Sequence, residues 1–148
     1  MVKKILCLFG LCGGIYVLLE LIFRGRSHIS MFFAGGLSAT CIFVCCQCGR
    51  LKKACMFTKC LFGSAVITAV EFVTGVIVNL WLRLSVWDYS DVPWNLLGQI
   101  CLPFSLIWFV LTLPILKFGT LVCGKDVQFF STAARKRATP DMPVSSGE

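Results

Sequence analysis

The sequence has few of the residues from which enzyme active sites are usually built. It holds one histidine and seven acidic residues in 148 positions. It contains no Ser–His–Asp order, no HExxH motif and no glycine-rich dinucleotide loop. The segment Gly119–Asp126 is similar to a P-loop as far as Lys125, but it lacks the Ser or Thr that would contact Mg²⁺, and no βαβ unit surrounds it. We therefore expect no enzyme activity, no cofactor and no nucleotide site.

Apolar residues, in contrast, are abundant. They make up 57% of the chain, and the mean hydropathy is +0.86, more than a soluble domain of this size could bury. Four long apolar runs lie at Ile5–Phe23, Ile29–Cys48, Cys60–Leu82 and Leu96–Leu116. A spanning helix needs about 20 such residues to cross about 30 Å of hydrocarbon. We predict an all-α polytopic membrane protein, with a four-helix bundle in residues 1–124 and a polar cytoplasmic tail at 125–148, disordered at its end.

The basic residues predict the orientation of these helices. The net charge is +7, and with four crossings eleven of the basic residues fall on the side of the termini and three on the other side. The first group is Lys3, Lys4, Arg50, Lys52, Lys53, Lys59, Lys117, Lys125, Arg135, Lys136 and Arg137, and the second is Arg24, Arg26 and Arg83. This asymmetry predicts that both termini are cytoplasmic. The basic excess then faces anionic lipid of the bilayer, and we expect no nucleic-acid partner.

Ten cysteines are present, several of them at the predicted cytoplasmic helix ends, where thiols normally stay reduced. The spacing of Cys45, Cys46 and Cys48 does not match the paired CxxC of a zinc site. We expect the cysteines to act as small apolar packing residues and to bind no metal. Ligation of a soft metal and lipidation are the alternatives.

Small residues indicate where helices approach one another closely. Gly10 and Gly14 form a G-x-x-x-G pattern in the first helix. Ser30, Ala34 and Ser38 recur every four residues in the second, so this face should pack tightly. The fourth helix is expected to begin near Asn95, Gly98 and Gln99 and to contain Pro103 and Pro114.

Polar residues converge on one side of the predicted membrane. In the third helix Glu71, Gly75 and Asn79 recur every four residues, so this polar face must look toward protein or water. Together with the two outer turns, it predicts an outward-facing polar pocket with Glu71 at its base. The candidate binding residues are Glu71, Asn79, Arg26, Ser27, His28, Trp87, Asp88, Tyr89, Asn95 and Gln99.

Several of these residues have alternative interpretations. A carboxylate at mid-membrane costs on the order of 3 kcal/mol unless it is protonated or paired, so Glu71 is either a proton- or cation-linked group or a neutral hydrogen-bonding link between helices. Asn79 is interpreted mainly as such a link. His28 is a weaker candidate for a pH sensor or a metal ligand. Arg26 is expected to form an ion pair with Asp88 or Asp91, and binding of an anionic ligand is the alternative.

The same segments carry a family resemblance. Residues 87–102 read WDYSDVPWNLLGQICL, residues 71–75 read EFVTG with Asn79 following, and residues 26–31 read RSHISM. These motifs, with Trp108, resemble a family of small bacterial membrane proteins called "Putative ABC-transporter type IV", or CmpB-like, over about Arg24 to Trp108. The resemblance implies membrane transport. The chain carries no ATP-binding cassette of its own, so any ATPase would be a separate cytoplasmic partner.

Three functional hypotheses follow. The first is a permease-like or solute-binding membrane subunit, oligomeric, with a small-molecule or ion substrate in the outer pocket. The second is a structural or regulatory membrane protein that docks a partner through its outer loop. The third, ranked last, is an intramembrane enzyme using Glu71, His28 and Asp88, which show no nucleophile and base at a fixed spacing.

Overall fold

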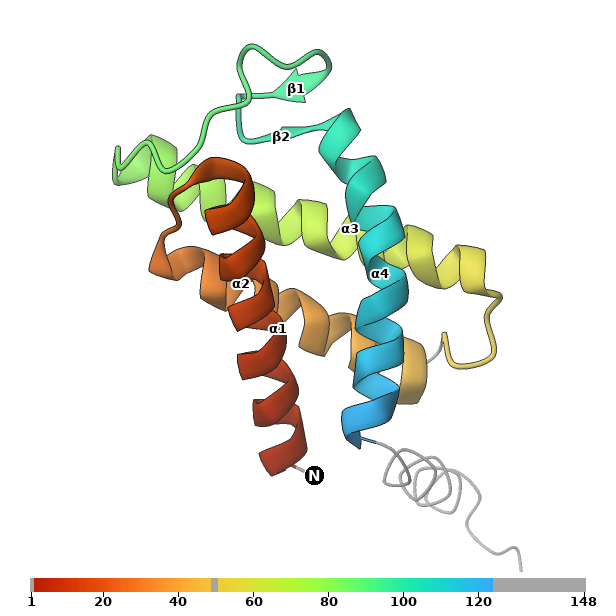
Figure 1. Ribbon diagram of the computed structural model, residues 1–148. Coiled ribbons are helices and arrows are strands. Elements are labelled where there is room, and N and C mark those ends of the chain that lie inside the picture. Colours follow the sequence, from red (N-terminus) through yellow and green to blue (C-terminus); the bar gives the residue numbers. More distant parts are fainter. Residues whose placement is uncertain (1, 49–50, 124–148) are drawn as a thin grey trace, which may run out of the picture.

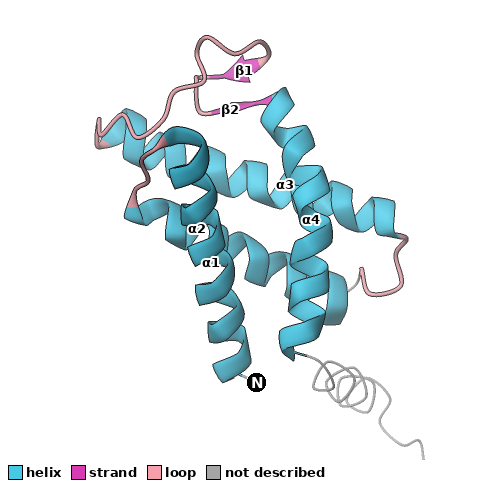
Figure 2. Ribbon diagram, viewed as in Figure 1, coloured by secondary structure: helices cyan, strands magenta, loops and turns pink. Residues whose placement is uncertain are grey.

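The computed structural model describes residues 2–48 and 51–123, and this part of the chain is mostly helical (Figures 1 and 2). The elements in chain order are α1 (Val2–Arg24), α2 (Ile29–Phe43), η1 (Val44–Cys48), α3 (Met56–Gly75), η2 (Val76–Trp81), β1 (Asn95–Leu96), β2 (Ile100–Cys101) and α4 (Leu102–Cys123). The segments η1 and η2 continue α2 and α3 as π-helical turns. The predicted tail at 125–148 lies outside the described residues.

Four described helices are long and apolar enough to cross a membrane, as the apolar runs predict. They are Val2–Arg24, Ile29–Gln47, Met56–Trp81 and Leu102–Val122. Many large apolar side chains point away from the protein, among them Phe23, which is 83% exposed. An apolar exterior of this extent is unfavourable in water and is typical of helices surrounded by lipid.

The fourth apolar run does not begin as a helix, so the prediction of helix from Leu96 is wrong. Asn95 pairs with Cys101 and Leu96 with Ile100 in a short antiparallel hairpin. The side chain of Asn95 accepts a hydrogen bond from the amide of Gly98 at 3.1 Å, and Gly98 has a φ of +66°, which glycine adopts readily. These local hydrogen bonds compete with a helix. The helix α4 starts only at Leu102.

Two prolines lie in α4, and their positions differ in kind. Pro103 is the second residue of the helix, where a backbone N–H has no helical partner, so proline is tolerated. Pro114 lies inside the helix. Neighbouring elements must then satisfy the backbone carbonyl that it frees.

Glycines let α1 and α2 pack closely. A Cβ atom added at Gly13 would lie 2.5 Å from the carbonyl oxygen of Phe32, and one added at Gly36 would lie 2.8 Å from that of Phe9. Ala34 and Ser38 of the predicted small face of α2 are buried, whereas Gly36, which meets Phe9 of α1, is not part of that face. In α1, however, the glycine that meets α2 is Gly13, because a Cβ atom at Gly10 or Gly14 would meet nothing within 4 Å.

The two ends of the molecule hold different segments of the chain. The side chain of Gln47 in η1 donates a hydrogen bond to Thr120 in α4 at 2.9 Å, and Figure 1 shows the N-terminus and the last turn of α4 at the same end. The hairpin and the α1–α2 turn lie at the opposite end (Figure 1). The tertiary structure thus gathers the predicted outer segments at one end.

The cysteines whose side chains are described are all free, and four of them, Cys12, Cys46, Cys60 and Cys101, are buried. Cys12 and Cys46 are members of apolar clusters. Within residues 2–48 and 51–123, no three His, Cys, Asp or Glu side chains gather as they would around a metal ion. Burial among apolar neighbours fits the interpretation of these thiols as packing groups.

Candidate ligand site

Glu71 is held inside the protein by two aromatic side chains. It lies on α3, is 4% exposed, and accepts a hydrogen bond from the indole N–H of Trp108 on α4 at 2.8 Å. Its other carboxylate oxygen accepts one from the hydroxyl of Tyr89 at 3.3 Å. Both oxygens are therefore satisfied by neutral donors. The group joins α3, α4 and the loop before the hairpin.

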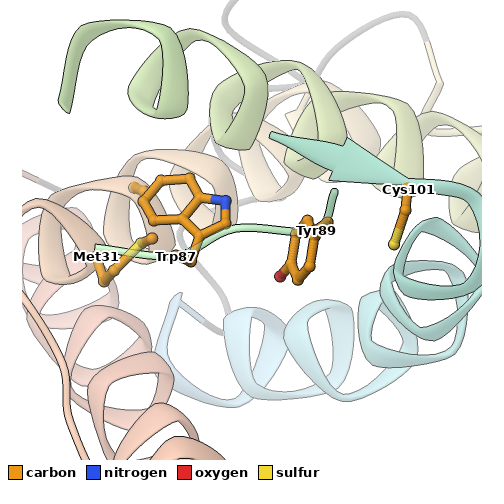
Figure 3. Close-up of a cluster of buried hydrophobic side chains, with 5 residues drawn as sticks. Met31, Trp87, Tyr89 and Cys101 are labelled. Carbon is orange, nitrogen blue, oxygen red and sulfur yellow. The ribbon is translucent and has the colours of Figure 1, made fainter. Parts of the chain in front are cut away.

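Tyr89 is fixed from three directions. Its ring stacks on Phe104 with centroids 4.7 Å apart, and the guanidinium carbon of Arg24 lies 5.2 Å from its centroid. Figure 3 shows its ring between Trp87 and Cys101. Burial raises the pKa of Tyr89 above its ordinary value of 10.0, and the negative charge of the nearby Glu71 raises it further. The hydroxyl therefore keeps its proton and stays a donor to Glu71 at neutral pH.

A cavity of about 400 Å³ lies between α1 and α4, next to this carboxylate. Its lining is mostly aromatic and aliphatic, with an acid and a base at one end. The lining residues are Tyr16, Leu19, Glu20, Phe23, Arg24, Tyr89, Phe104, Ile107, Trp108 and Leu111. Glu71 is not among them, but both of its hydrogen-bond donors are. This volume lies within the range of about 300–1,000 Å³ that is usual for small-molecule sites.

Polar groups at the end of the cavity are linked to one another. Glu20 accepts hydrogen bonds from the guanidinium of Arg24 at 3.3 Å and from the hydroxyl of Ser27 at 2.8 Å. The pair Arg24–Glu20 is also an ion pair. Ser27, a predicted site residue, thus lies beside the cavity.

Asn79 and Gln99, both predicted as binding residues, bind each other. The amide of Asn79 donates to Gln99 at 2.8 Å and to the carbonyl of Trp87 at 3.0 Å, and its oxygen accepts from the backbone of Val86 at 2.7 Å. The indole of Trp87 donates to the carbonyl of Gln99 at 3.0 Å. This network fastens the loop to η2. The sequence predicts a link between two helices, but in the structure Asn79 joins η2 to the loop and the hairpin.

Asp88 and Asn95 shape the hairpin. The hydroxyl of Ser90 donates a hydrogen bond to Asp88, and the amide of Ser90 donates another at 2.8 Å. The first and then the second of these bonds lower the pKa of Asp88 below its ordinary value. The side chain of Asn95 donates to the carbonyls of Ser90 and Val92 at 3.1 and 2.8 Å. Both side chains are exposed and make local bonds outside the cavity.

The remaining predicted residues of the first turn do not meet the second. The ring nitrogen Nδ1 of His28 accepts a hydrogen bond from the amide of Ser30 at 3.2 Å, so His28 caps α2. Arg26 is exposed, and in the part of the chain that the structure describes it forms no ion pair with Asp88 or Asp91. The expected ion pair is therefore not found, because Asp88 is engaged by its own loop.

The predicted set of binding residues does not include Tyr16, Arg24 or Phe104, which surround the cavity. Tyr16 stacks on Trp108 with centroids 5.7 Å apart, and Phe104 and Arg24 contact Tyr89. Trp108 entered only through the family resemblance. For Trp108 one signal was available: Trp side chains favour the membrane interface, so a Trp deep within an apolar run indicates a buried hydrogen-bond partner, here Glu71.

The four long apolar helices, with an exterior suited to lipid, define a multi-pass membrane protein. A family model described as "Putative ABC-transporter type IV" matches residues 4–139. The chain belongs to this family, as its motifs predict. No curated protein and no solved structure matches the chain.

Proposed function

We propose that the protein is a transport-related subunit, permease-like or solute-binding, that takes a small molecule or ion into the cavity between α1 and α4. The observation that carries this proposal is the buried Glu71, whose donors Tyr89 and Trp108 form one wall of that cavity. A ligand that displaced or polarised either donor would change the hydrogen bonding of Glu71. Binding in the cavity and the state of the carboxylate would then be coupled.

The remaining features of the proposal concern topology and partners. The basic end, with both termini, faces the cytoplasm of the cell membrane. The chain is not itself an enzyme. Family membership supports an ATPase or other membrane protein as a separate partner, and the protein assembles as a homo-oligomer.

The substitution Glu71→Gln tests the transport role. In the native host, a strain that lacks the gene is complemented with the wild type, with Glu71→Gln or with Asp91→Asn, so that any ATPase partner is present. Small solutes and ions are compared by mass spectrometry and elemental analysis. We expect at least one solute whose uptake depends on the wild type, is lost with Glu71→Gln and is kept with Asp91→Asn, an exposed carboxylate of the hairpin loop. Normal uptake by a correctly inserted Glu71→Gln would contradict the role of this residue.

Orientation is tested by thiol labelling. The described cysteines on the predicted cytoplasmic side are Cys7, Cys45, Cys46, Cys55 and Cys60, whereas Cys101 beside the hairpin is buried. A membrane-impermeant maleimide should therefore leave the wild type unlabelled in intact cells and should label Ser90→Cys, because Ser90 is exposed at the outer end. The opposite pattern would reverse the proposed topology.

A second function, docking of a protein partner by the outer loop, is favoured by one observation. Trp94 is 79% exposed and Leu97 63% exposed, and both have positive φ angles, 60° and 53°, which are unfavourable for residues with a side chain. Chemical crosslinking from Ser90→Cys to one membrane protein, with loss of that link in Trp94→Ser, would support this function. Uptake that survives Trp94→Ser would separate it from transport.

A further inference from the structure

The cavity continues along α1 and α4 toward the opposite end of the molecule. A second, smaller cavity of about 90 Å³ shares Tyr16, Leu19, Trp108 and Leu111 with the first and extends past Cys12 to Phe118. The two cavities therefore adjoin each other along α1 and α4, and α2 and α3 also line the smaller one. Together they are called the groove below. Its first part carries the ion pair Arg24–Glu20, whereas its second part is lined almost wholly by apolar side chains.

The groove lies at the lipid-facing side of the protein. Phe23 is 83% exposed, Ile107 47% and Phe118 43%, and each of them lines the groove on α1 or α4. In a membrane these side chains contact acyl chains. A molecule dissolved in the bilayer could enter the groove sideways without crossing the hairpin.

The polar end of the groove is suited to a positive charge. Tyr16, Tyr89, Phe104 and Trp108 present aromatic rings to it, and aromatic faces attract cations. Arg24 already occupies the face of Tyr89 while it pairs with Glu20, so the protein itself places a cation there. Glu71 lies behind the rings of Tyr89 and Trp108. The polar end of the groove therefore has two carboxylates near it, Glu20 and Glu71, and one guanidinium, that of Arg24.

We infer that the groove binds an amphiphilic cation, with its charged head against Glu20 and the aromatic rings and its aliphatic chain along Cys12, Ile15 and Phe118. This inference rests on the proposed function, since it names the ligand class of the same cavity. An anionic head would face Glu20 and the negative faces of the rings. The guanidinium of Arg24 is the cation in this lining, and it is already paired with Glu20. A soluble cation without a chain would leave the apolar part of the groove unused.

Direct binding tests the inference. The purified protein in nanodiscs of zwitterionic lipid is titrated with radiolabelled dodecyltrimethylammonium, and uptake by empty nanodiscs is subtracted. We expect saturable binding of one molecule per chain. Tetramethylammonium and dodecyl sulfate should each bind at least about tenfold more weakly, since the first lacks the chain and the second carries the wrong charge.

Two variants locate the site. Glu20→Gln should weaken dodecyltrimethylammonium binding by about tenfold, because the head loses its carboxylate and Arg24 loses its partner. Ile107→Trp should fill the groove and abolish binding, while Asp91→Asn should bind as the wild type does. An unchanged elution profile and unfolding temperature show that each variant is folded. If Glu20→Gln misfolds, Ile107→Trp still decides.

The outcomes separate this inference from the proposed function. Equal binding of dodecyl sulfate, equal binding of tetramethylammonium, or binding unaffected by Ile107→Trp each overturns the amphiphilic cation. If no probe binds while a different solute shows uptake dependent on Glu71, the inference fails and the transport role stands. Binding of the probe without any such uptake would support the ligand class and contradict transport.

Discussion

Helix α1 packs against α2 on one side and against α4 on another. These two contacts, called the glycine seam and the aromatic seam below, are packed in opposite ways. Toward α2, Gly13 and Gly36 bring the backbones so close that a methyl group would not fit. Toward α4, rings and long aliphatic side chains such as Tyr16 and Leu19 leave a cavity of about 400 Å³. Because apolar side chains gain little by leaving lipid, close packing of small residues is what holds membrane helices together. The glycine seam therefore supplies stability, and the aromatic seam is free to bind a ligand.

The largest loss of stability is expected when a side chain is introduced into the glycine seam. Gly13→Leu should lower the free energy of unfolding by about 3 kcal/mol or more, because its Cβ alone would clash with the backbone of Phe32. Unfolding in mixed micelles, followed by circular dichroism, measures this change. Gly14→Leu is the matched control, with open space at its Cβ, and equal destabilisation of the two variants would refute the assignment of the seam.

An intermediate effect is expected at the buried carboxylate of Glu71, beside the cavity between α1 and α4. Trp108→Phe removes the donor to one oxygen of Glu71 and should lower the free energy of unfolding by about 1–3 kcal/mol, because a buried acceptor is left unsatisfied. The same unfolding experiment measures it. Trp94→Phe, at an exposed tryptophan of the hairpin loop, should be close to neutral. A neutral Trp108→Phe would mean that the hydrogen bond to Glu71 contributes nothing to the fold.

The smallest change in stability is expected at the aromatic seam between α1 and α4. Leu19→Phe adds atoms beside the cavity and should change the free energy of unfolding by less than about 1 kcal/mol, because overpacking is unfavourable only where space is already filled. It should nevertheless weaken ligand binding in the groove. Destabilisation as large as that of Gly13→Leu would show that the α1–α4 seam is packed as tightly as the α1–α2 seam.

Sequence patterns predicted some parts of the site and not others. Glu71 could be singled out because a carboxylate in an apolar run needs a partner, and Asn79 because it shares the face of Glu71. Tyr16 and Phe104 could not, since an aromatic residue in a spanning helix looks the same whether it faces lipid or a cavity. The predicted polar pocket is divided in the structure: Asn79 and Gln99 bind each other, Asp88 and Asn95 fold the loop, and Arg26 stays exposed.

The start of α4 shows the same limit at the level of secondary structure. Hydropathy cannot distinguish an apolar hairpin from the first turns of an apolar helix, and the run from Leu96 contains both. Local bonds made by Asn95, together with the positive φ of Gly98, decide for the hairpin. The hairpin also positions two side chains of the site, because it brings Gln99 to Asn79 and keeps Tyr89 within hydrogen-bond distance of Glu71.

By itself the sequence determined that four apolar helices form and that the carboxylate of Glu71 lies within the third apolar run, because burial in lipid depends on the length and hydropathy of each run alone. Only the tertiary structure decided which helices touch and which leave a groove. That choice depends on the direction in which each small or aromatic side chain points toward a neighbouring helix. A linear pattern does not contain those neighbours.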